Sequence, residues 1–182
     1  MKHVVLTAAL IAAFASPVLA QKGKMVGGAE MYPTKNIIEN AVNSKDHTTL
    51  VAAVKAADLV ETLSSEGPFT VFAPTNAAFD ALPAGTVEGL LKPEAKKQLQ
   101  AVLTYHVLAG NFDSKAVAEA IKKGGGKASM KTVEGGELMF SMKGDDLMVM
   151  DASGTSAKVT IADVYQSNGV IHVIDAVLLP KM

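Results

Sequence analysis

The fold is expected to form around Gly67-Pro68-Phe69-Thr70-Val71-Phe72-Ala73-Pro74-Thr75-Asn76-Ala77-Ala78-Phe79, a stretch that joins a buried strand to a helix. The residues between Pro68 and Pro74 include no charge and are rich in β-branched and aromatic side chains. This composition is typical of a strand that is buried on both faces. Asn76 is predicted to cap the helix that follows, because its side-chain oxygen suits a free N–H group of the first turn. We interpret the stretch as a corner of the core without a nucleophile.

The pattern on either side of this corner is helical. Apolar residues recur at spacings of three and four between residues 37 and 63, where Asp46 is an expected cap. Further helices are predicted near residues 86–91, from Pro93 to a stop at Gly110, and near residues 113–123. Gly124-Gly125-Gly126 stops the last of them and is interpreted as a loop rather than as a phosphate cradle.

From about residue 130 the apolar period changes to two. The predicted strands are 130–133, 137–142, 147–150, 157–165 and 170–179, each separated from the next by a glycine-containing turn. Asn168-Gly169 is the strongest turn signal and predicts a type I′ hairpin. Helices followed by a strand meander predict an α+β fold in a single module.

The N-terminus has the pattern of a secretory signal peptide. Residues 1–20 contain Lys2, an apolar run from Val4 to Phe14, and small residues at the last and third-last positions. Cleavage is expected after Ala20, which places the mature protein in the periplasm or outside the cell. The apolar run is shorter than the roughly 20 residues of a spanning helix, so no transmembrane segment is expected after signal removal. Residues 21–35 are expected to form a flexible leader before the domain at residues 36–181.

Composition limits the function classes. The chain has no cysteine, so packing rather than disulfides is expected to hold it together. Its 17 basic residues are all lysines and are balanced by 18 carboxylates. Nucleic acid is therefore not expected as a partner, because the forked guanidinium group and an excess of positive charge are both missing.

Three blocks of the sequence resemble the fasciclin domain (FAS1) family. Thr70-x-Phe72-Ala73-Pro74-x-x-x-Ala78-Phe79 is similar to its first signature block, Tyr105-His106 to the second, and Gly169-Val170-Ile171-His172-Val173-Ile174-Asp175 to the third. The likeness extends from about Asn36 to Pro180. It implies a FAS1-type wedge or sandwich of short strands with a layer of N-terminal helices. It also implies a bacterial secreted single-domain protein. Members of the family are mostly non-enzymatic and act in adhesion or matrix contacts.

The resemblance also implies candidate contact residues. Tyr105 matches a position implicated in receptor contacts in some animal family members. Asp163 and Val164 match an integrin-contact pair of animal fasciclin domains, although Ile161-Ala162 and Tyr165 replace the usual residues on either side. Asp163 has the alternative role of capping a turn.

The other matched residues are expected to build the fold. They are Thr70, Phe72, Ala73, Pro74, Phe79, His106, Gly169, His172 and Asp175. His106 follows Leu99, Val102 and Leu103 on one helix face, which predicts a core histidine that donates to a backbone carbonyl. His172 interrupts an apolar strand without a second histidine or a cysteine nearby, so a hydrogen-bonded histidine is favoured over a metal ligand. Asp175 is expected to be paired or hydrogen-bonded.

Met139, Met142, Met148 and Met150 cluster on two neighbouring predicted strands. In an exported protein, such thioethers could bind Cu(I). The alternative is that they fill gaps in a core, which is the ordinary use of methionine.

The residues favour an interaction module over an enzyme. The sequence has no Gly-x-Ser-x-Gly elbow and no Ser-x-x-Lys pair, and no catalytic acid pair stands out among its scattered carboxylates. We expect a non-enzymatic adhesion or matrix-interaction protein without an obligatory cofactor, whose partner is an unknown protein or a surface or matrix component. The alternative is a periplasmic carrier that holds a small apolar ligand between the helices and the strands.

Overall fold

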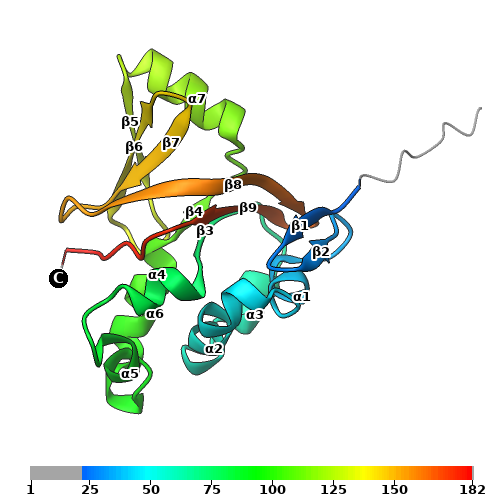
Figure 1. The fold of residues 1–182 in the computed structure, drawn as a ribbon, viewed down its shortest axis with the longest axis vertical. Coiled ribbons are helices and arrows are strands. Elements are labelled where there is room, and N and C mark those ends of the chain that lie inside the picture. Colours follow the sequence, from blue (N-terminus) through cyan, green and yellow to red (C-terminus); the bar gives the residue numbers. More distant parts are fainter. Residues whose placement is uncertain (1–21, 182) are drawn as a thin grey trace, which may run out of the picture.

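A seven-stranded sheet forms the centre of the computed structural model, which describes residues 22–181 (Figure 1). The strands follow the order β4-β3-β9-β8-β7-β6-β5, and neighbours pair antiparallel except β3 and β9, which are parallel. The strands are β3 (Phe69–Pro74), β4 (Val107–Ala109), β5 (Lys127–Lys131), β6 (Glu137–Lys143), β7 (Asp146–Met150), β8 (Ser156–Gln166) and β9 (Gly169–Ile174). The predicted signal peptide lies outside the described residues.

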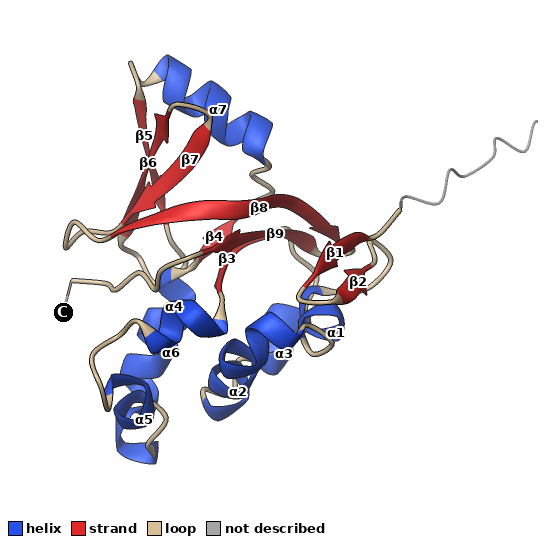
Figure 2. Ribbon diagram, in the orientation of Figure 1, coloured by secondary structure: helices blue, strands red, loops and turns tan. Residues whose placement is uncertain are grey.

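The helices cover both ends of this sheet. They are α1 (Ile37–Ala41), α2 (Thr48–Ala56), α3 (Val60–Ser64), α4 (Asn76–Asp80), α5 (Thr86–Leu90), α6 (Lys96–Tyr105) and α7 (Ser114–Lys123), with 3₁₀ turns η1 (Lys45–His47) and η2 (Pro93–Ala95). Figure 2 shows α1 to α6 gathered below β3 and β9, whereas α7 lies against the far end beside β5 to β7. This arrangement confirms the predicted α+β class. Among the described residues, no helix has the length and apolar character needed to cross a membrane.

Strand β3 supplies side chains to both halves of the interior. Val71 and Ala73 pack with the helical layer, while Phe72 points into the second core between the sheet and α7. Successive side chains of a strand point to opposite faces, so a strand between two cores must be apolar throughout. The Phe72 ring lies 5.3 Å from that of Phe140 on β6.

The helix cap after β3 differs from the prediction. Thr75, not Asn76, caps α4, because the Thr75 side chain accepts from Ala78 N. Asn76 is the first helical residue, and its Oδ1 accepts from Thr49 N at 3.0 Å. Asn76 therefore caps α2, a helix that precedes it by 20 residues in the chain. The expected cap Asp46 lies inside η1, whose N-cap is Ser44.

The predicted flexible leader is wrong for residues 24–31. These residues form a hairpin of β1 (Lys24–Val26) and β2 (Ala29–Met31), which lies beside α1 and the end of β8 (Figure 1). Val26 and Met31 are each 2% exposed and belong to the main core. The turn uses Gly27 at φ 57° and Gly28 at φ 76°, the left-handed conformations that glycine adopts without strain. The folded unit therefore begins before residue 36.

Three expectations about the C-terminal half also need correction. The helix predicted to run from Pro93 to Gly110 ends at Tyr105, and the apolar residues after it form β4. The last strand ends at Ile174 rather than at Leu179. Asn168 does not have the positive φ of a type I′ turn. Gly169 is needed for a different reason, because a Cβ there would lie 2.0 Å from the Phe69 carbonyl oxygen of the neighbouring strand.

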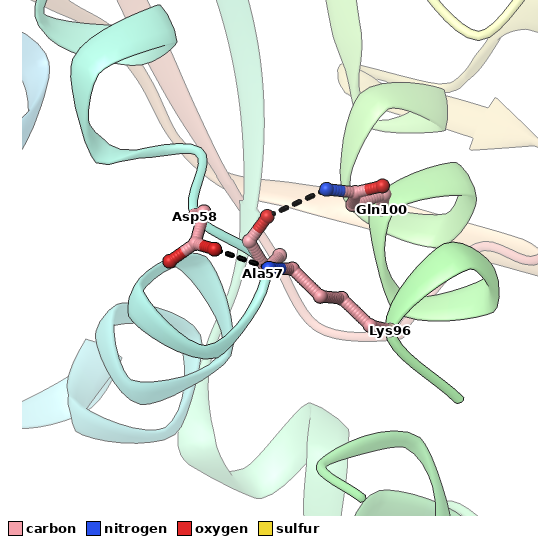
Figure 3. Close-up of polar contacts among 4 residues, drawn as sticks. All are labelled: Ala57, Asp58, Lys96 and Gln100. Atoms are coloured by element: carbon pink, nitrogen blue, oxygen red, sulfur yellow. Dashed lines mark hydrogen bonds and ion pairs between the residues drawn. The ribbon is translucent and has the colours of Figure 1, made fainter. Parts of the chain in front are cut away.

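Polar contacts join α2 to α6 across the helical layer (Figure 3). Gln100 Nε2 donates to the Ala57 carbonyl at the end of α2 at 2.8 Å. Asp58, with φ 55°, forms an ion pair with Lys96 at the surface. Because both charged side chains are exposed, we expect the amide contact to fix the helix pair more than the ion pair does.

Candidate functional site

The structure removes two of the three expected contact residues from the surface. Tyr105 is 1% exposed, and its hydroxyl donates to Glu137 O and accepts from Ala152 N. Val164 is 0% exposed and packs in the main core. Neither side chain reaches a partner without unpacking the domain, which corrects their assignment as contacts. The alternation along β8 explains this result, since an inward Val164 leaves its neighbour Tyr165 facing outward.

Asp163 is part of an irregular segment of β8. The register of β8 against β9 shifts on both sides of Ile161, and Asp163 adopts φ 55°. The Asp163 carboxylate accepts from both the backbone N–H and the hydroxyl of Ser114, the first residue of α7. We call residues 161–165 the β8 bulge. Asp163 thereby joins the bulge to the start of α7, and both hydrogen bonds to its carboxylate come from within the domain.

Tyr165 is the exposed side chain of this bulge. It is 41% exposed, and its hydroxyl donates to Asp113 Oδ2 at 3.3 Å. A groove of about 360 Å³ separates the bulge from the N-terminal hairpin. The groove is lined by Lys22, Gly23, Lys24, Met31, Pro33, Asp163 and Tyr165. Residues 21–35 are polar and without an apolar period, which predicted a flexible leader and so no surface at this place.

His106 is buried in the centre of the molecule. Its Nδ1 donates to Val102 O at 2.7 Å, and its Nε2 accepts from Leu178 N at 3.0 Å. Burial lowers the pKa of His106 to about 4, so the ring is neutral near pH 7. The ring joins α6 to the C-terminal segment, and both nitrogens have backbone partners.

Asp151 is a second buried group at this place and was not singled out from the sequence. It is 5% exposed, and its Oδ1 accepts from Ser153 and Thr155. Its Oδ2 accepts from Leu179 N at 2.9 Å. Despite burial, hydrogen bonds from these donors hold the pKa of Asp151 below its usual value. The short Asp-x-Ser spacing after a strand was the available sequence signal for a carboxylate that closes a turn.

His172 fixes the loop between β4 and α7. Its Nε2 donates to Phe112 O at 2.8 Å, and its ring stacks on Phe72 with centroids 5.3 Å apart. Burial lowers the pKa of His172. Thr70 secures the same loop, because its hydroxyl donates to Gly110 O and accepts from Phe112 N, each at 2.8 Å. His106 and His172 thus bond to different segments and do not converge on a cleft.

The remaining motif residues occupy structural positions. Ala73 and Pro74 lie on β3 opposite Val173 and Ile174 of β9, and Phe79 packs in a small core under α4. The Asp175 carboxylate is exposed and accepts from Lys158 N at 2.7 Å, which ties the end of β9 to β8. Across residues 22–181, no three histidine, cysteine or carboxylate side chains gather as metal ligands would.

An apolar cavity of about 40 Å³ lies between the sheet and helices α1 to α3. His47 and His106 contribute to its wall, which is otherwise built mainly of aliphatic side chains. His47 Nδ1 contacts Ser44 Oγ at 2.8 Å, whereas its Nε2 has no hydrogen-bond partner among the described residues. Sites for organic ligands usually measure roughly 300–1,000 Å³, so this cavity is too small for such a ligand unless the helices move.

A fasciclin domain model matches residues 45–180. Protein sll1483 of Synechocystis sp. is 49% identical over 162 residues, which cover 89% of this chain and 83% of the relative. The cell surface glycolipoprotein MPB83 of Mycobacterium bovis is 37% identical over 145 residues, which cover 77% of this chain and 58% of that protein.

A solved structure has the same fold. It is a FAS1 domain pair from the insect cell adhesion molecule Fasciclin I, with a TM-score of 0.71 over 81% of this chain and 52% of that chain. At 17% identity this likeness shows the fold alone. The FAS1-type sheet with its helical layer agrees with the arrangement expected from the three motif blocks. On the family match and the sequence identities together, the chain belongs to the fasciclin domain family.

Proposed function

We propose that the protein is a non-enzymatic interaction module that acts outside the cytoplasm in attachment to a surface or matrix component. Its contact surface is the groove between the N-terminal hairpin and the β8 bulge. The folded module extends from this hairpin to residue 181 as a single fasciclin domain. Removal of the signal peptide near Ala20 leaves the hairpin close to the new N-terminus.

The observation on which this proposal rests is the exposed Tyr165 beside the groove. Tyrosine provides a large, rigid contact area together with a hydroxyl, and it is enriched in protein interfaces. Lys22 and Lys24 lie on the hairpin side of the groove and Asp163 on the other, and the Lys24 ammonium group reaches across to donate to Ala162 O of the bulge. A partner that offers an apolar group to Tyr165 and a carboxylate to the lysines matches this lining. Asp163 holds the bulge in place rather than making the main contact.

The interior supports a surface function. Three of the buried side chains with acid or base chemistry, His106, Asp151 and His172, bond to backbone groups that hold the fold together. Another, His47, contacts Ser44 and lines the small apolar cavity. A general acid or base needs access to a reacting proton. The positions that resemble the family motifs therefore stabilise the module, and recognition of a partner falls to its exposed surface.

The relatives support the same class of function. MPB83 is a cell surface glycolipoprotein, and the solved structure belongs to an insect cell adhesion molecule. Attachment at the cell surface or to a matrix is the activity that agrees with both names. The absence of arginine and the nearly balanced charge of the chain do not favour nucleic acid as the partner.

The alternative function is transport of a small apolar ligand. The cavity beneath α1 to α3 has a suitable lining, but its volume of about 40 Å³ is far below that of ligand sites. A carrier would need these helices to separate from the sheet. Mass spectrometry of the protein purified under native conditions decides between the two, because a carrier retains a stoichiometric small molecule and an attachment module does not.

Attachment of producing cells to a surface tests the main proposal. Cells that lack the protein are expected to attach less, and the Tyr165→Ala variant is expected not to restore attachment. Leu91→Ala is the matched control, because Leu91 is 36% exposed but follows α5, at the other end of the molecule from the hairpin (Figure 1). Equal attachment with and without the protein would contradict the proposed function. Normal attachment with Tyr165→Ala would exclude this contact surface.

A further inference from the structure

Three methionines face outward from β6 and β7. Leu138 and Phe140 are 0% exposed and point into the core, so the alternating Met139 lies on the opposite face and is 40% exposed. On β7 the buried side chains are Leu147 and Val149, and the half-buried Met148 and Met150 alternate with them. Met139, Met148 and Met150 therefore share one face, which we call the methionine face.

The strand register brings these three side chains together. Met139 lies directly opposite Met150 across the β6–β7 pair, where Cβ atoms of paired residues are about 4.5–5.5 Å apart. Met148 is two residues from Met150 on the same face, a distance of about 7 Å along the strand. A methionine side chain has three rotatable bonds, so the three sulfur atoms are able to meet at one point above the sheet.

Gap filling does not explain the methionine face. None of its members belongs to or packs against the hydrophobic clusters of the core. Their cross-strand neighbours are mainly serines, because Ser129 pairs with Met139, Ser141 with Met148, and Ser156 with Met150. Helix α7 covers the other face of these strands, where Val117 and Ile121 join the core. The thioethers thus lie outside the core, beside three serines and Lys158.

We propose that the methionine face binds one Cu(I) ion through the three sulfur atoms of Met139, Met148 and Met150. Thioethers are soft ligands that select Cu(I) over the hard cations that carboxylates bind. Cu(I) accepts a low coordination number, and an S₃ set on one face of the sheet leaves the outward side open for exchange with another copper carrier. This activity is separate from attachment and involves a different surface from the groove beside Tyr165.

Neighbouring charge is compatible with a bound cation. Lys158 pairs with Met148 across β7 and β8, which places an ammonium group close to the site. Its Nζ forms an ion pair with Asp146 at 2.9 Å, so the Asp146 carboxylate compensates this charge. Replacement of Lys158 by Gln is expected to leave Cu(I) affinity unchanged or to strengthen it.

Anaerobic titration with Cu(I) in competition with a chromogenic chelator tests the proposal. The full mature protein is expected to bind one Cu(I) with a dissociation constant below about 1 μM. Met139→Leu and Met150→Leu are each expected to weaken binding by at least about tenfold, because loss of even a supporting group near a metal has an effect of that size. Leucine keeps the apolar volume, so these variants change the sulfur and little else.

Met142→Leu is the matched control. Met142 is on the same strand and is 43% exposed, but it lies on the opposite face with Phe140, where it lines a recess beside α7. This variant is expected to bind Cu(I) like the unmodified protein. In NMR spectra with labelled methionine methyl groups, Ag(I) used as a redox-stable probe is expected to shift the signals of the methionine face and not that of Met142. Binding weaker than about 1 μM, or equal loss of affinity in Met142→Leu and Met150→Leu, would overturn the proposal.

Discussion

His106 and Asp151 accept hydrogen bonds from two consecutive backbone N–H groups. Leu178 N donates to His106 Nε2 at 3.0 Å, and Leu179 N donates to Asp151 Oδ2 at 2.9 Å. The two side chains come from different parts of the chain, one after α6 and one after β7. Together they hold the C-terminal segment after β9 against the core. This contact depends on a neutral histidine and a charged carboxylate at the same time.

The stability of the protein is therefore expected to fall as the pH is lowered from 7 to 4.5. Burial lowers the pKa of His106 from 6.5 to about 4, so between these values the unfolded chain binds a proton that the folded chain does not. The contribution of the neutral His106 ring to stability is fully present above pH 6.5 and declines toward pH 4. His106 alone accounts for about 2–3 kcal/mol of this loss. Urea unfolding at the two pH values measures it.

His106→Gln provides the comparison for this measurement. Glutamine offers an amide donor and a carbonyl acceptor but does not titrate, so the variant is less stable at pH 7 and loses less on acidification. The pKa values of His47 and His172 are also lowered by burial. Their contribution to the pH dependence of stability is therefore the same in the unmodified protein and in His106→Gln. The depressed pKa of Asp151 adds a further loss at lower pH, as its carboxylate becomes protonated. An identical pH dependence in the variant would contradict the role of His106.

Asn76→Ala is expected to lower the free energy of unfolding by about 2 kcal/mol. The change removes the acceptor for Thr49 N at the start of α2 and leaves the Lys45 carbonyl without the Asn76 amide donor. Loss of a cap typically costs about 1 kcal/mol, and loss of the hydrogen bond to the Lys45 carbonyl adds a similar amount. Thermal unfolding followed by circular dichroism measures the effect.

Asn43→Ala serves as the control, because the exposed Asn43 makes a single hydrogen bond to Glu39 O. A change of no more than about 0.5 kcal/mol is expected for it. Equal effects of the two substitutions would show that Asn76 does not cap α2.

The sequence predicted the parts of the fold that depend on local pattern. The run from Phe69 to Ala73 could be recognised as a doubly buried strand because charge-free β-branched residues between prolines leave few alternatives. The Asn76 cap shows the limit of such reasoning. Its side chain was expected to cap the helix that follows it, which is wrong, because Thr75 caps that helix and Asn76 caps α2, which is adjacent in space and not next in the chain. Contacts of this kind depend on tertiary packing.

The N-terminal hairpin and β4 were missed because the local sequence of each is compatible with more than one structure. Gly27-Gly28 occurs in flexible segments and in tight turns alike, and only burial of Val26 and Met31 identifies the hairpin. Strand β4 was assigned to a helix because its apolar residues continue the period of α6. Of the expected contact residues, Tyr105 and Val164 were placed by resemblance alone. The period of two along β8 was the available signal that Tyr165, and not Val164, faces outward.

Variants of Asp163 and Asp58 separate the effect of backbone strain on stability from the effect of hydrogen bonding. Asp163 and Asp58 both adopt φ 55°, a conformation that costs alanine roughly 1–2 kcal/mol. Asp58→Ala is expected to show this cost and little more, because the exposed ion pair with Lys96 is worth at most about 1 kcal/mol. Asp163→Ala is expected to cost about 2 kcal/mol beyond Asp58→Ala, since it also removes both hydrogen bonds from Ser114.

Asp163→Asn completes this comparison. Asparagine tolerates the left-handed conformation and retains one side-chain oxygen for Ser114 N, so the variant is expected to be more stable than Asp163→Ala. Urea unfolding of the four proteins at pH 7 gives the free energies. If Asp163→Ala and Asp58→Ala lose equal stability, the carboxylate of Asp163 does not anchor α7. The β8 bulge, and with it the position of Tyr165, would then depend on the bond from Asp163 N to His172 Nδ1 at 3.4 Å.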